Sequence, residues 1–173
     1  MSQALLTVIG EDRPGIVAAV TQALYVADCA IGDASMMRLG GYFTIMQVIE
    51  YSRDFGTVEA ALDPAVRRLG LRVHLDPISS LPQQEDVANV RITVYGADHP
   101  GIVASVTGAL AGLGFNIIDL ESERSGNPER PLYVMVIQGS APGGVENVRK
   151  ILEPLKEQEG IEISVHATDT VLF

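Results

Sequence analysis

The sequence contains a single cysteine, Cys29, and only three histidines among its 173 residues. A lone cysteine forms no disulfide within the chain, and no histidine stands at metal-ligand spacing from it, so a disulfide framework and a Cys/His metal site are excluded. Cys29 follows a predicted helix in an apolar context, and we expect a buried, unreactive thiol there. We predict no metal and no cofactor.

Basic residues are also scarce. The chain has 12 lysines and arginines against 22 aspartates and glutamates, for a formal net charge of −10. Because phosphate contacts need a basic surface, direct nucleic-acid binding is not expected. No apolar run approaches the ~18 residues of a membrane span, and the first residues carry no basic region or cleavage-site pattern. We therefore predict a cytoplasmic protein with no membrane partner.

The most informative feature that is present is an internal repeat. GEDRPGIVAAVTQAL, from Gly10 to Leu24, returns as GADHPGIVASVTGAL from Gly96 to Leu110, with eleven of fifteen positions identical. A self-match at a constant offset of 86 residues indicates two copies of one structural unit. We predict a first domain over residues 1–78, a polar, proline-containing linker over 79–86, and a second domain over 87–173.

Hydrophobic periodicity predicts the same order of elements in each copy. The predicted strands are 5–9, 31–39, 42–51 and 71–75, then 90–95, 117–123, 132–138 and 161–165. The predicted helices are 14–27 and 57–69, then 100–113 and 145–158. The predicted helices 57–69 and 145–158 each contain a proline. Asp63-Pro64 is compatible with the start of a new helix and Glu153-Pro154 with a kink, and the sequence alone does not decide between these alternatives.

A βαββαβ unit with right-handed crossovers forms a four-stranded antiparallel sheet with both helices on one face. The sequence therefore predicts an α+β protein of two tandem ferredoxin-like domains. The hairpin segments Phe43–Ile49 and Leu132–Ile137 are apolar at nearly every position, whereas a sheet covered on one side shows alternation. We expect the other repeat or another subunit to cover an open face or an edge, which predicts a homodimer or higher oligomer.

The motifs carry a family resemblance. A strand, then G-x-D-x-P-G-I-V opening a helix, then N-I-x-D opening the next strand, resembles the ACT domain, a small-molecule regulatory module. The second copy supplies GADHPG and NIID, and the first supplies GEDRPG and AIGD. Two such units, with a longer hairpin in the second, resemble the glycine cleavage system transcriptional repressor family. The resemblance implies regulation by an amino acid, glycine or another, and no motif supports a catalytic residue.

The resemblance also implies a ligand where the first loop and helix of one unit meet a neighbouring unit. The positions that it marks are Asp12, Arg13, Gly15 and Ile16 in the first copy, and Asp98, His99, Gly101, Ile102, Asn116 and Ile117 in the second. Backbone N–H groups at a helix start suit a carboxylate, and a side-chain carboxylate or amide suits an ammonium. Asn116 has Ala30 as its counterpart, so we predict the better site in the second copy.

Structural roles compete with these assignments. The two aspartates are also favoured helix N-cap residues, the two glycines would also serve helix-to-strand packing, and Asn116 would also satisfy a turn backbone. His99 is a candidate for a pH-dependent role because of its place in the loop. The residues expected to face solvent on strands are Asp33, Asp119, His74 and His166.

Three functions follow. The first is an amino-acid sensor that acts through contact with a protein such as a transcription factor or enzyme, so that any effect on transcription is indirect. The second is a regulatory subunit of an amino-acid biosynthetic enzyme, like the small subunit of acetohydroxyacid synthase. The third is a ligand-free dimerising scaffold. The full second copy favours the sensor, because such small subunits resemble the ACT domain only in their front half.

Overall fold

The structure is a computed structural model that describes residues 2–79, 87–127 and 130–168. It divides into two compact units, residues 1–83 and 84–173, and each unit is described by itself. Apart from Ser79, the predicted linker lies outside the described residues, as does part of the longer hairpin of the second copy. The domain boundaries therefore stay a prediction.

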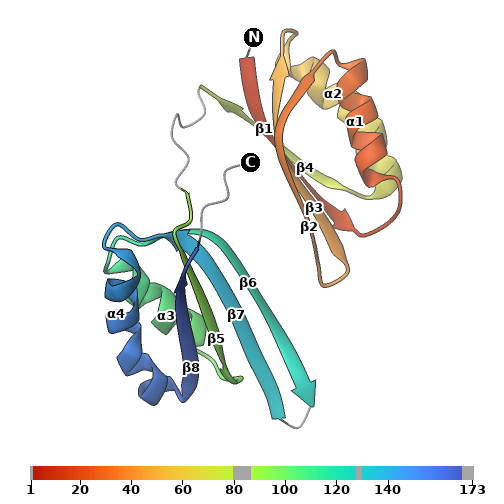
Figure 1. Cartoon of the computed structure of the whole chain (residues 1–173). Coiled ribbons are helices and arrows are strands. Elements are labelled where there is room, and N and C mark those ends of the chain that lie inside the picture. The colour runs from red at the N-terminus through yellow and green to blue at the C-terminus, as the bar shows by residue number, and fades with distance from the viewer. Residues whose placement is uncertain (1, 80–86, 128–129, 169–173) are drawn as a thin grey trace. The chain divides into compact units, whose positions relative to one another are not determined.

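Each unit contains a four-stranded antiparallel sheet and two helices. The first comprises β1 (Ser2–Glu11), α1 (Ile16–Val26), β2 (Ala30–Leu39), β3 (Tyr42–Tyr51), α2 (Phe55–Leu69) and β4 (Arg72–Ile78). The second comprises β5 (Val90–Ala97), α3 (Ile102–Ala111), β6 (Asn116–Asn127), β7 (Arg130–Ser140), α4 (Gly144–Glu159) and β8 (Ile161–Ala167). The strand orders are β2-β3-β1-β4 and β6-β7-β5-β8. In each unit both helices cover one face of the sheet (Figure 1), which confirms the predicted ferredoxin-like fold.

The alternation of buried and half-buried residues along β1 explains how the sheet and helices pack together. Ala4, Leu6 and Val8 are at most 1% exposed, whereas the residues between them are half-buried. Helix α1 meets this face with side chains at helical spacing, among them Val20 and Leu24. Fully burying an aliphatic side chain of this size stabilises the fold by about 1.5–3 kcal/mol. The second unit repeats the arrangement with Val90, Ile92 and Val94 beneath α3.

The structure excludes the new helix start that the sequence allowed at Asp63-Pro64. Helix α2 is continuous across Pro64, and it begins after Asp54, whose side chain accepts a hydrogen bond from the Gly56 N–H at 3.0 Å. A new helix therefore does not start at Asp63. Pro154 likewise lies inside α4. Both prolines are exposed, so the turn that lacks a backbone hydrogen bond faces solvent rather than the core.

Strand β2 forms an edge of the first sheet, and all ten of its residues are exposed. The exposed side chains include the large apolar residues Ile31, Met36, Met37 and Leu39. An apolar edge strand is a common site of association with another chain. The expected covering of this edge by another subunit stays a prediction.

Gln47 is a polar exception in the core of the first unit. Its side chain is 1% exposed, it lies across from Leu6 on β1 and Ala34 on β2, and no described residue gives either amide atom a hydrogen-bond partner. The counterpart in the second unit is Ile137, which lies across from Ile92. One unit therefore buries an amide where the other buries a hydrocarbon.

We predict that Gln47→Ile raises the free energy of unfolding of the first unit by about 1–3 kcal/mol, because a buried polar group without a partner costs that much. Urea denaturation of the full chain measures the change. The reciprocal variant, Ile137→Gln, is the matched control and should destabilise the second unit by a similar amount. A lower urea midpoint for Gln47→Ile would show that the amide makes a favourable contact in solution.

Candidate functional site

The candidate site of each unit is the loop between the central strand and the first helix, residues 12–15 after β1 and 98–101 after β5. Glycine near the end of each central strand positions this loop. A Cβ atom added at Gly10 would lie 2.6 Å from Leu71 Cδ2, and one added at Gly96 would lie 2.8 Å from Ile161 Cγ2. Glycine is required at Gly96, where the Ile161 backbone is also close, whereas at Gly10 the flexible end of the Leu71 side chain could move aside.

Gly15 and Gly101 have a different reason to be glycine. They occupy the N-cap positions of α1 and α3 with φ angles of 92° and 109°, a conformation that residues with a Cβ rarely adopt. A Cβ added at either position would meet nothing within 4 Å. The helix-to-strand packing reading is therefore wrong: the backbone turn, not a close contact, requires glycine here.

Asp12 and Asp98 do not cap the helices, because neither α1 nor α3 has a side-chain cap hydrogen bond among the described residues. Each carboxylate instead pairs with an arginine of the edge strand. Asp12 Oδ2 lies 2.7 Å from Arg38 Nε, and Asp98 Oδ2 lies 2.8 Å from Arg124 Nε. The N-cap reading of these aspartates is thus also wrong.

The backbone of each aspartate ties the same loop to the hairpin. The Asp12 N–H donates to the Gly41 carbonyl at 2.9 Å, and the Asp98 N–H donates to the Pro131 carbonyl at 3.1 Å. Arg38 and Arg124 were missed as site residues because they lie outside the D-x-P-G motif. One signal could have found them: they stand 86 residues apart, which is the offset of the repeat.

His99 links the second loop to the end of α4. Its Nδ1 lies 3.1 Å from the Pro100 carbonyl oxygen and its Nε2 lies 2.8 Å from that of Glu159. Both oxygens are acceptors, so the ring satisfies both contacts only as an imidazolium. These two hydrogen bonds are the main reason that the pKa of His99 is raised above its usual 6.5; the carboxylates of Glu159 and Asp98 add to the effect, and burial opposes it.

The Glu159 side chain completes this link. Its Oε1 accepts a hydrogen bond from Ser105 Oγ on α3 at 2.6 Å, and its Oε2 lies 3.9 Å from His99 Nε2. The first unit has Arg13 in place of His99, and this side chain pairs with Glu11 at 2.9 Å. Arginine keeps its charge at all physiological pH values, so only the second loop contains a group that titrates near neutral pH.

Asn116 does not lie beside the loop of its own unit. It pairs with Ser140 at one end of β7, whereas Ala97, next to the loop, pairs with Leu132. Those partners are eight residues apart on β7, which corresponds to about 27 Å along a strand. Within one unit the structure thus brings together the loop and the edge-strand arginine but not Asn116 or its neighbour Ile117.

Ile16 and Ile102 are core residues, each 2% exposed, so only their backbone is available to a ligand.

Cys29 is half-buried rather than buried. Burial is the main cause that raises the pKa of its thiol, Asp28 adds to it and Arg53 opposes it; the thiol is therefore a poor nucleophile. The strand residues expected to face solvent, Asp33, Asp119, His74 and His166, are exposed. None of the helices in the described ranges has the length and apolar character to cross a membrane.

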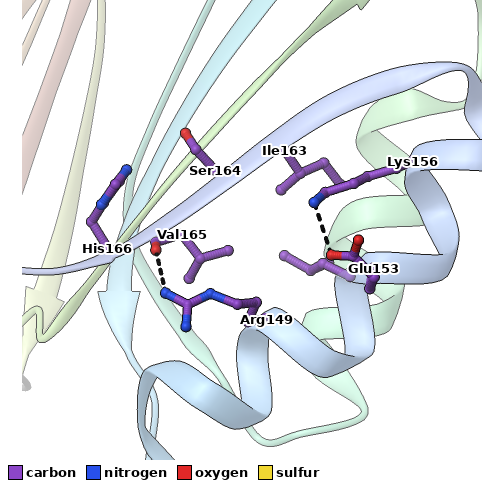
Figure 2. Close-up of a pocket in the computed structure, with 8 residues that line it drawn as sticks. Arg149, Glu153, Lys156, Ile163, Ser164, Val165 and His166 are labelled. Atoms are coloured by element: carbon purple, nitrogen blue, oxygen red, sulfur yellow. Dashed lines mark hydrogen bonds and ion pairs between the residues drawn. The ribbon is translucent and has the colours of Figure 1, made fainter.

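A groove between α4 and β8, with a volume of about 240 Å³, contains several charged side chains, but they are engaged with one another (Figure 2). Arg149 donates to the Val165 carbonyl at 3.1 Å and pairs with Glu146. Lys156 pairs with Glu153 at 2.8 Å. The corresponding groove of the first unit, between α2 and β4, has Glu59 and Asp63 but no cation among its described lining residues. The groove is therefore a weaker candidate for an anionic ligand than the loops, which recur in both units.

Comparison with known proteins gives the same two units. Family models described as the ACT domain match residues 2–76 and residues 90–160. The UPF0237 protein YjhC of Lactococcus lactis is 36% identical over 74 residues, 42% of this chain and 85% of that protein.

Two further matches extend over both units or most of them. The glycine cleavage system transcriptional repressor of Escherichia coli is 29% identical over 119 residues, 68% of this chain but only 63% of the repressor. The crystal structure of an unknown protein from Galdieria sulphuraria is similar with a TM-score of 0.80 at 28% identity, covering 97% of this chain and 99% of that one. Whole-chain similarity of this kind supports the tandem arrangement.

We predict that the second unit loses stability as the pH rises above 6.5 and through the raised folded-state pKa of His99. The protonated ring favours the folded state, so its contribution is fully present below the unfolded pKa and disappears above the folded one. Thermal unfolding between pH 6 and pH 8 should show a smaller pH dependence in His99→Gln than in the parent chain. His74→Gln is the control for loss of an exposed histidine; equal pH dependence in the parent and His99→Gln would contradict the prediction.

Proposed function

This chain belongs to the ACT domain family, and on that premise we propose that it senses a free amino acid at the two loops and acts through contact with another protein, without catalysis. The observation that carries the proposal is the repetition, in both units, of a loop with an aspartate carboxylate at its start and, at its end, a helix start that no described side chain caps. An amino acid presents an ammonium and a carboxylate a few ångströms apart, and the loop offers a partner for each.

The contribution of Asn116 requires a neighbouring unit, and we propose that a second copy of the chain supplies it. Strand β6 is an edge strand that begins at Asn116, and near its other end Arg124 contacts the loop through Asp98. If the β6 strands of two copies pair in antiparallel register, the start of each strand lies beside the far end of the other. Asn116 of the second copy would then face the Asp98 loop of the first, which agrees with the ligand contact that the family resemblance implies.

Similarity to the repressor supports a role in gene regulation, and the charge of this chain favours an indirect one. The net charge of −10 opposes contact with phosphates. We propose that the partner is a protein such as a transcription factor or an enzyme. The apolar edge strand β2, with Met36, Met37 and Leu39 exposed, is a surface that would suit such a contact.

We predict that one of the twenty amino acids stabilises the chain in a thermal-shift screen, by about 2.7 kcal/mol at 100 times its Kd. The substitution Asp12→Ala is introduced first, to remove binding at the first loop. In that variant, a further Asp98→Ala or Asn116→Ala should weaken binding about 10- to 150-fold, because each removes a hydrogen bond to a charged ligand group. Isothermal titration calorimetry measures the loss.

Mixing the two variants tests whether the site is shared between copies. In a mixed dimer, one of the two sites takes its intact aspartate from the Asn116→Ala chain and its intact asparagine from the Asp98→Ala chain. Half of the dimers in an equal mixture are mixed, so about a quarter of the parent sites should bind the ligand again. A chain that carries both substitutions, mixed with itself, is the control. Failure of the mixture to recover binding would place the whole site within one copy, and no stabilisation by any amino acid would overturn the sensor and favour the scaffold.

We predict that the isolated chain does not shift a DNA fragment at physiological salt in a gel assay, because its surface lacks the excess of cations that non-specific binding needs. A DNA-binding protein of similar size is the positive control. Binding by this chain with a steep loss of affinity as salt rises would show direct contact with DNA.

A further inference from the structure

The Asp12–Arg38 and Asp98–Arg124 ion pairs share one geometry although the strands around the arginines differ. Met36 and Met37 precede Arg38, whereas Ser122 and Glu123 precede Arg124. In both units the contact joins the carboxylate Oδ2 to the guanidinium Nε, at 2.7 and 2.8 Å. Two otherwise different edge strands have therefore kept the same residue against the same loop.

Stability is a weak explanation for these pairs. The arginine side chains are 74% and 75% exposed, and ion pairs at this exposure contribute about 0–1 kcal/mol. The loop is also held to the hairpin without them, through the backbone hydrogen bonds from Asp12 and Asp98. A contact that adds little to the fold and is present twice points to a role in binding.

The chemistry of the pair matches an amino acid. A guanidinium has five N–H donors and binds carboxylates in a two-pronged geometry, and one aspartate carboxylate, in contact with its Nε, does not occupy all five. The aspartate side chains are more covered, at 27% and 17% exposed. The pair thus presents an anion and an exposed cation side by side, which are the complements of an ammonium and a carboxylate.

We propose that Arg38 and Arg124 join the helix N–H groups in binding the α-carboxylate of the amino acid while Asp12 and Asp98 bind its ammonium, so that the ligand replaces one internal ion pair with two. This inference rests on the proposed function and names the class of ligand: a free amino acid with both charges. A ligand with one charge separates the aspartate from the arginine but gives only one of these two side chains a new partner. Amines, amides and N-acylated amino acids are therefore rejected.

The experiment uses the full chain and three probes: the amino acid selected by the thermal-shift screen, its α-amide and its N-acetyl derivative. The parent chain should bind the amino acid at least about tenfold more tightly than either derivative. The double variant Arg38→Ala/Arg124→Ala should lose about 10- to 150-fold in affinity for the amino acid and should no longer distinguish it from the amide. Arg38→Lys/Arg124→Lys should keep part of the preference, since lysine has the charge without the two-pronged geometry.

Arg91→Ala is the matched control, because it removes an exposed arginine of the second unit outside the loop. Unchanged affinity in the double alanine variant, with binding to the parent intact, would overturn this inference and leave the sensor standing. Absence of binding to the parent would overturn both. Urea denaturation gives a test without ligand: a large loss of stability in the double alanine variant would show that the pairs are structural and overturn the inference.

Discussion

Burial of one sheet face beneath two helices is the constraint on which the rest of each unit depends. It makes β1 and β5 interior strands, with Leu6 and Ile92 fully buried beneath the helices. The chain must therefore leave the sheet from an interior strand and return over the same face as a helix. The turn that does this, with Gly15 or Gly101 in a left-handed conformation, is the candidate ligand loop. Its position follows from the packing of the core.

The same constraint separates what could be predicted from what could not. Element order, strand alternation and the place of the loop depend on local periodicity and the repeat, and these were legible in the sequence. The Asp98–Arg124 contact depends on the register of the β6–β7 hairpin, which a bulge between Ile117 and Asp119 shifts by one residue. A bulge adds an unpaired residue that the alternation of a single strand does not locate, so the sequence did not reveal the arginine partner and the aspartates were interpreted as N-caps. The distance of Asn116 from the loop follows from strand direction, which the fold prediction already implied.

The two units share a backbone and differ in charge and polarity. The second has a titratable histidine in its loop where the first has Arg13, and it buries Ile137 where the first buries Gln47. The edge strands differ as well, with methionines on β2 and acidic residues such as Glu121 and Glu123 on β6. Because the loops keep their geometry while their surroundings change, the duplication favours two related sites with different sensitivities rather than two equivalent ones.

The weakness of the Asp–Arg pairs is consistent with the proposed role in sensing. A buried ion pair costs several kcal/mol to separate, and a small ligand could not recover that much from two contacts. An exposed pair contributes about 0–1 kcal/mol, so a ligand that separates it loses little by doing so. The arginine also belongs to the edge strand, and the aspartate belongs to the loop. Any ligand that exchanges this pair would therefore contact both the loop and an edge strand of the sheet.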